Sequence, residues 1–143
     1  MGKRYLILCA VVSALMGAQA PPDFSGTWKL DTLRSRFAKD AQAPKSQVLR
    51  IDQHGSTVDI KMTTVTRTGE NTEAFESNAP AAGPSAMWDD DYLVLESHHD
   101  TPDGPQVVTR RLKRGDKDKI MTAVTTVKDK SGENTTYEFY VKE

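Results

Sequence analysis

The sequence of 143 residues contains three histidines, which are the residue type that most readily suggests a metal site. His98 and His99 are adjacent and Asp100 follows them, while His54 lies in a separate turn-like segment. Imidazole and carboxylate groups are zinc ligands, and a zinc site needs three or four of them. Neighbouring side chains of a strand point to opposite faces, so His98 and His99 are poorly placed to bind one ion. We therefore predict no metal site.

The other patterns with chemical potential are weak. Asp89-Asp90-Asp91 offers the clustered oxygen ligands that calcium favours, but an EF-hand loop does not follow, and a polar hairpin turn accounts for it. The sequence contains no Gly-x-Ser-x-Gly elbow, no phosphate-binding loop and no His-Glu-x-x-His motif. We predict no catalytic residues, no cofactor and a protein that is not an enzyme.

Residues 1–20 have the pattern of an export signal. Lys3 and Arg4 provide a basic start, an apolar run extends from Leu6 to Met16, and Ala18-Gln19-Ala20 has the form of a cleavage site. The alternative is an uncleaved anchor, although the run is shorter than the about 20 residues of a membrane-spanning helix. We therefore expect a signal peptide and a secreted or periplasmic location.

Residues 21–143 are expected to form a single domain. Without the signal this segment has no cysteine, because Cys9 is the only one, so disulfides and thiolate metal sites are excluded. The chain has 19 basic and 20 acidic residues, and loss of the two basic residues of the signal leaves a net charge of about −3. Nucleic acids and anionic membranes bind clustered basic excess. We expect a monomer that binds no nucleic acid and is not stably inserted in a membrane.

Glycine-containing turns divide this domain into segments with the pattern of strands. Each of these turns has a glycine next to, or two positions from, an Asn, Asp or Ser residue; the glycines are Gly55, Gly69, Gly104 and Gly132. The segments between the turns are rich in β-branched residues or alternate apolar with polar residues. Only Thr32 to Gln42 resembles a helix, of one or two turns. The expected strands are residues 24–31, 46–53, 56–66, 71–77, a short run to 88, 92–99, 105–113, 118–128 and 134–142.

This order of elements predicts an all-β fold. Short hairpin links favour antiparallel neighbours, and many strands in hairpin succession fit an up-and-down barrel or a sandwich. A barrel leaves no unpaired edge, so we predict an antiparallel up-and-down barrel of about eight to nine strands, with at most a short helix after the first. At about eight strands the interior is either filled by side chains or holds one small ligand.

The segment Phe24-Ser25-Gly26-Thr27-Trp28-Lys29-Leu30 resembles the first-strand motif of the calycins, which include lipocalins and intracellular fatty-acid-binding proteins. Residues 22–143 further resemble small secreted bacterial proteins with a lipocalin-like domain, most of them without an assigned function. Residues 44–51 and 87–97 support this second resemblance. Together they imply a lipocalin-like barrel.

The calycin resemblance also implies a role for the motif residues. In calycins the tryptophan packs across the closed end of the barrel, a role that falls here to Trp28, and Gly26 would allow the backbone to approach closely. A basic residue from a late strand commonly covers this tryptophan by a cation–π contact. The candidates are Lys142, Arg110 and Arg111.

Alternation along the strands gives a set of side chains expected to line the barrel. In the last strand we expect Tyr137, Phe139 and Val141 to point inward. A mixed apolar and hydroxyl lining suits a small amphipathic ligand, and it suits a filled core equally well. We predict a lipocalin-like protein that binds a small apolar or amphipathic ligand; the alternative is a ligand-free envelope accessory or protein-interaction module with a filled core. The candidate ligand-binding residues are Trp28, Ile60, Met62, Leu93, Leu95, Val124, Tyr137 and Phe139.

Overall fold

The computed structural model describes residues 20–81 and 83–143. The predicted signal peptide therefore lies, except for Ala20, outside the described residues, and its prediction stays untested. The described residues form nine strands: β1 (Gly26–Leu30), β2 (Ser46–His54), β3 (Thr57–Val65), β4 (Glu70–Glu76), β5 (Ser85–Asp89), β6 (Tyr92–Thr101), β7 (Gly104–Arg114), β8 (Ile120–Asp129) and β9 (Gly132–Lys142).

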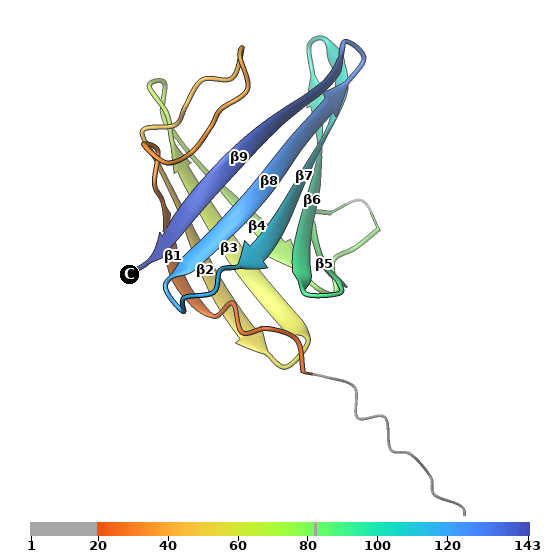
Figure 1. Ribbon diagram of the computed structural model, residues 1–143. Coiled ribbons are helices and arrows are strands. Elements are labelled where there is room, and N and C mark those ends of the chain that lie inside the picture. Colours follow the sequence, from red (N-terminus) through yellow and green to blue (C-terminus); the bar gives the residue numbers. More distant parts are fainter. Residues whose placement is uncertain (1–19, 82) are drawn as a thin grey trace, which may run out of the picture.

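The strands form a closed barrel in which neighbours in sequence are neighbours in space. β1 pairs with both β2 and β9 and thereby closes the cylinder (Figure 1). All pairs are antiparallel except β4 and β5, which run parallel and meet only at Glu76 and Ser85. The predicted all-β up-and-down barrel is confirmed, but it is not antiparallel throughout. The linker after β4 is longer than a hairpin turn, so β5 starts beside the end of β4 and continues in the same direction.

The segment Thr32–Gln42, the one candidate for a short helix, does not form one, and the described residues contain no helix. The carboxylate of Asp31 accepts hydrogen bonds from the backbone N–H groups of Leu33 and Arg34, at 3.1 and 3.2 Å. Arg36 then exchanges two backbone hydrogen bonds with Tyr137 of β9, at 2.7 and 2.9 Å. Backbone groups that a helix would have used are thus bonded to a strand instead. In the part of the chain that is described, no helix is long and apolar enough to span a membrane.

The two ends of the barrel differ in what fills them. We call the end with the turns after β2, β5 and β7 the closed end, and the opposite end, which the segment 31–45 borders, the mouth (Figure 1). An apolar core occupies the closed end and the middle of the barrel. Its members are Phe24, Trp28, Leu30, Leu49, Ile51, Val58, Ile60, Met62, Phe75, Ala86, Leu93, Leu95, Leu112, Met121, Ala123 and Tyr140.

The predicted direction of β8 and β9 is wrong. Tyr137 is 58% exposed and Val124 38% exposed, because both lie on the outer face, where they are cross-strand partners. Phe139 also faces outward and is half-buried by the guanidinium of Arg34, whose Cζ lies 5.0 Å from the ring centroid. A shift of one residue moves every side chain of a strand to the other face. One wrong choice of the inner face of β9 therefore misplaces Tyr137, Phe139 and Val141 together.

The indole of Trp28 lies in the core near the closed end of the barrel, where the calycin resemblance leads us to expect it. Its side chain is fully buried, and its Nε1–H donates a hydrogen bond of 2.7 Å to the carbonyl of Phe24. Lys142 Nζ and Arg114 Cζ each lie 5.5 Å from a Trp28 ring centroid, so the cation–π contact expected of Lys142 is present and Arg114 adds a second. Of the other candidates, Arg111 instead covers Tyr92.

We expect Gly26→Ala to destabilise the protein more than Gly132→Ala. Both glycines have positive φ, 124° and 134°, so an L-residue at either position costs about 1–3 kcal/mol of backbone strain. Only at Gly26 would a Cβ fall 2.5 Å from Cε of Lys142, whereas nothing lies within 4 Å at Gly132. Displacing Lys142 from Trp28 adds about 0.5–2 kcal/mol. Urea unfolding of the two variants measures this difference, and equal losses would contradict the role given to Gly26.

Candidate functional site

A polar layer lies above the apolar core, on the side of the mouth. On the inner faces of β2, β7, β8 and β9, the positions next to the core on the side of the mouth are Gln47, Arg110, Thr125 and Glu138. Tyr140 is the next inward residue of β9 after Glu138, toward the closed end. Alternation in each strand puts these five side chains inside, and the register brings them together. This layer is the candidate functional site.

An ion pair between Arg110 and Glu138 is the centre of the layer. Nη1 of Arg110 lies 2.9 Å from Oε1 of Glu138 and also donates to Oγ1 of Thr125, at 3.0 Å. The side chains of Arg110 and Glu138 are only 14% and 5% exposed, so their charges attract each other with little screening by water. The pair leaves the interior with no net formal charge at this point.

Tyr140 and Gln47 extend this network. The Tyr140 hydroxyl lies within hydrogen-bond distance of two acceptors, Oε1 of Gln47 at 2.5 Å and Oε2 of Glu138, and its single proton serves one at a time. Gln47 Nε2 donates to Oγ1 of Thr64, at 2.9 Å. Burial, followed by the nearby Glu138 carboxylate, raises the pKa of Tyr140 well above 10.0. Tyr140 is therefore a neutral hydrogen-bonding group over the physiological pH range.

A cavity of about 210 Å³ opens above this network at the mouth. Leu30, Phe37 and Pro44 give it an apolar side. Its polar side consists of Gln47, Thr64, Thr66, Arg110, Thr125, Thr136 and Glu138, and Ala41 and Gln42 border it from the segment before β2. A cavity of about 150 Å³ is enough to hold benzene, so this one has room for a molecule of about six to eight carbon atoms.

The histidines are not gathered into a metal site. His98 faces outward and lies 2.9 Å from Oε1 of Glu96, whereas His99 faces inward, 3.0 Å from Oγ of Ser97 and 3.4 Å from Oε1 of Glu73. The two rings thus point to opposite faces, as strand alternation predicts. Among the described residues no group of three or more His, Cys, Asp or Glu side chains is arranged to hold a metal ion.

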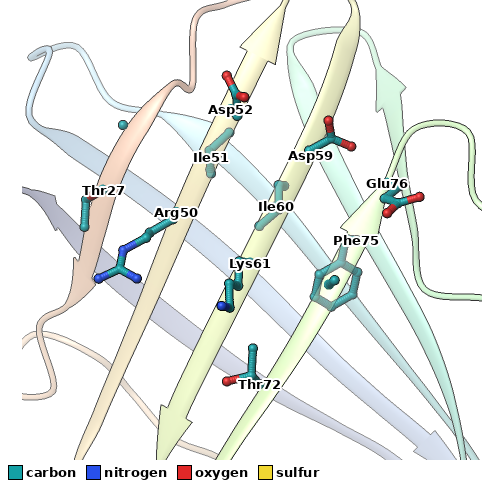
Figure 2. A pocket seen from close by; sticks show the side chains of 12 residues that line it. Thr27, Arg50, Ile51, Asp52, Asp59, Ile60, Lys61, Thr72, Phe75 and Glu76 are labelled. Atoms are coloured by element: carbon teal, nitrogen blue, oxygen red, sulfur yellow. The ribbon is translucent and has the colours of Figure 1, made fainter.

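A second hollow lies outside the barrel. It measures about 570 Å³ and extends over the outer surface of β1 to β4, with charged side chains around it (Figure 2). Asp52 and Asp59 are cross-strand neighbours there, as are Arg50 and Lys61, so like charges face each other. This hollow is shallow and separate from the interior, and none of the sequence-based site residues except Ile60 borders it.

The structure places the eight candidate ligand-binding residues in two groups. Those on β1, β3 and β6 are buried in the apolar core, and the three on β8 and β9 lie on the outer face. None of the eight borders the interior cavity at the mouth. Whether any of them contacts a ligand stays a prediction. The buried residues of this set are Trp28, Ile60, Met62, Leu93 and Leu95, and the outer ones are Val124, Tyr137 and Phe139.

Sequence reasoning missed Arg110 and Glu138 as interior residues, although one signal pointed to Glu138. Lys142 can cover Trp28 only if it shares the face of β9 that leads to the barrel interior. Alternation then puts Tyr140 and Glu138 on that same face. The choice of the more apolar face of β9 as the inner one outweighed this signal.

Comparison with known proteins adds little to this description. No family model matches the sequence, and no curated protein matches it. Among solved structures, the chain is similar to zebrafish ileal bile acid-binding protein complexed with cholic acid, at 12% sequence identity and a TM-score of 0.43. The match covers 84% of this chain and 98% of that chain. A likeness of this degree identifies neither a family nor a ligand.

Proposed function

We propose that this protein is a small-molecule binding protein, not an enzyme, and that its ligand occupies the cavity at the mouth of the barrel. The observation that carries the proposal is the cavity of about 210 Å³ with one apolar and one polar side, above the apolar core of the barrel. Ligand pockets combine apolar walls with a few polar groups that fix orientation. The cavity is smaller than the about 300–1,000 Å³ of typical pockets, so the ligand is small and amphipathic.

The donors of Arg110 support this proposal. Its guanidinium carries five N–H groups, and within the described residues only Nη1 makes hydrogen bonds. Nε and Nη2 are not among the fully buried atoms that lack a partner. These two nitrogen atoms are accessible donors on a side chain that Glu138 and Thr125 hold in place. A ligand in the cavity can therefore accept hydrogen bonds from a guanidinium group of fixed position.

The proposal includes a secreted or periplasmic location and membership of the lipocalin-like proteins. The basic start, the apolar run and the Ala18-Gln19-Ala20 site support export, and Trp28 with its covering Lys142 supports the lipocalin-like assignment. Amino-terminal sequencing of the mature protein tests export. We expect Pro21 as the first residue, and an intact Met1 would contradict it.

Benzyl alcohol is a suitable probe of the cavity, because it is neutral, amphipathic and of the right size. We expect it to shift the NMR resonances of Thr64, Thr125 and Thr136 saturably. Thr64→Phe fills the cavity and abolishes the shifts at Thr125 and Thr136, whereas Thr63→Phe, on the outer face of the same strand, leaves them unchanged. Shifts that do not saturate, or an equal response in both variants, would contradict the proposal.

One observation favours the alternative of an interaction module. An outward row crosses five strands, β5 to β9, through the register Met87–Val94–Arg111–Val124–Tyr137. Three of its apolar side chains are exposed, Met87 at 54% among them. Exposed apolar side chains in a contiguous patch are typical of protein-binding surfaces. A wild-type protein whose barrel takes up no benzyl alcohol would favour this second candidate.

A further inference from the structure

We infer that the cavity selects ligands with a neutral polar group that both accepts and donates hydrogen bonds, such as a primary amide, and discriminates against carboxylates. This inference rests on the proposed function. Its basis is that the buried cation of the site, Arg110, is already paired with a buried anion, Glu138, at 2.9 Å.

The Arg110–Glu138 pair sets the electrostatics of the cavity. Both side chains border it, and among the residues that the structure describes no other charged side chain does. A carboxylate that approaches the free donors of Arg110 also approaches the Glu138 carboxylate. Like charges at such distances repel strongly where water is scarce. For an anionic ligand, repulsion by the Glu138 carboxylate therefore cancels most of the electrostatic attraction to Arg110.

A neutral amide has the opposite balance. Its carbonyl oxygen accepts from Nε or Nη2 of Arg110, and its NH₂ group donates to Glu138. A carboxylate has about four lone-pair sites, and the network uses one on each oxygen of Glu138, so acceptor capacity remains. The hydroxyls of Thr125 and Thr136 add adaptable partners in the same wall. The apolar side, from Leu30, Phe37 and Pro44, then receives a short alkyl chain.

Hexanamide and hexanoate are a matched pair of probes, because they have the same chain and nearly the same shape and differ in charge. We expect the wild-type protein at pH 7.5 to bind hexanamide about tenfold or more tightly than hexanoate, measured by NMR titration of the Thr125 and Thr136 resonances. Glu138→Gln removes the anion and leaves Arg110 in place. In this variant we expect the preference to reverse in favour of hexanoate, and Glu138→Asp, which keeps the charge, should keep the preference for hexanamide.

The outcomes separate the two proposals. Hexanoate that binds to the wild type as tightly as hexanamide overturns the inference and leaves the proposed function standing. If neither hexanamide, hexanoate nor benzyl alcohol binds, the proposed function fails as well. The wild-type comparison needs no variant, so it decides the question even if Glu138→Gln does not fold. A folded Glu138→Gln protein that still prefers the amide also overturns the inference, because the carboxylate is then not the discriminating group.

Discussion

Arg110→Met is expected to cost about 3–5 kcal/mol in the free energy of unfolding. The substitution leaves the Glu138 carboxylate, 5% exposed, in the interior without its cation. An uncompensated buried charge is among the most damaging changes in a protein interior, and the total stability of a domain of this size is only about 5–15 kcal/mol. Equilibrium unfolding in urea, followed by tryptophan fluorescence, measures the loss.

Arg111→Met is the matched control for this prediction. Arg111 is the next residue of β7, faces outward and pairs with Asp89, and their side chains are 43% and 53% exposed. An exposed pair contributes about 0–1 kcal/mol, and salt weakens it. We expect a small loss for Arg111→Met that shrinks at high salt, and a large loss for Arg110→Met that does not. Similar losses at both positions would contradict the buried ion pair.

The double variant Arg110→Met, Glu138→Met distinguishes the effect of an unpaired charge from the effect of lost side-chain packing. A buried ion pair replaced by apolar side chains of similar volume is often neutral or stabilising. We therefore expect the double variant to recover most of the stability that Arg110→Met loses, with the Tyr140 hydroxyl donating to Gln47 alone. A double variant as unstable as the single one would mean that Arg110 acts through packing and not through its charge.

The strand order of this protein could be predicted from its sequence because the signals are local. Gly55 and Gly132 mark tight hairpins, and each expected strand lies within a few residues of an observed one. The parallel meeting of Glu76 and Ser85 had no such signal, since it depends on where a long linker brings the chain back. The candidate helical segment after β1 is not helical, because Tyr137, about a hundred residues away, takes up the backbone groups of Arg36.

The candidate site as a whole could not be predicted, because it depends on how β2, β7, β8 and β9 are in register with one another. In β9 the more apolar face, with Tyr137 and Phe139, is the outer one, and the face with Glu138 and Tyr140 is buried. Hydrophobicity alone selects the wrong face when a buried layer consists of paired charges. Such a layer is recognisable only when its partners on other strands, here Arg110 and Gln47, are known to meet it.

Trp28→Ala is expected to destabilise the protein about as much as Arg110→Met, by about 3–5 kcal/mol, through a different physical effect. Trp28 is fully buried, so the substitution leaves a large cavity at the closed end. The carbonyl of Phe24 also loses its hydrogen bond from Nε1, and the cations of Arg114 and Lys142 lose the ring that they cover. Because the substitution removes one of the two tryptophans, unfolding is followed by far-ultraviolet circular dichroism, a signal that does not depend on them.

Trp88→Ala is the matched control, because it removes the same side chain from the same end of the barrel. Trp88 is only partly buried, packs against Phe24 at a ring-centroid distance of 5.8 Å and donates an exposed hydrogen bond of 2.9 Å to Ser56. Its truncation leaves a surface that water can fill, so we expect it to cost less than half of what Trp28→Ala costs. If the two losses are equal, the closed end is held by the aromatic cluster as a whole. The separate role given to Trp28 at the closed end then fails, while the polar layer at the mouth is unaffected.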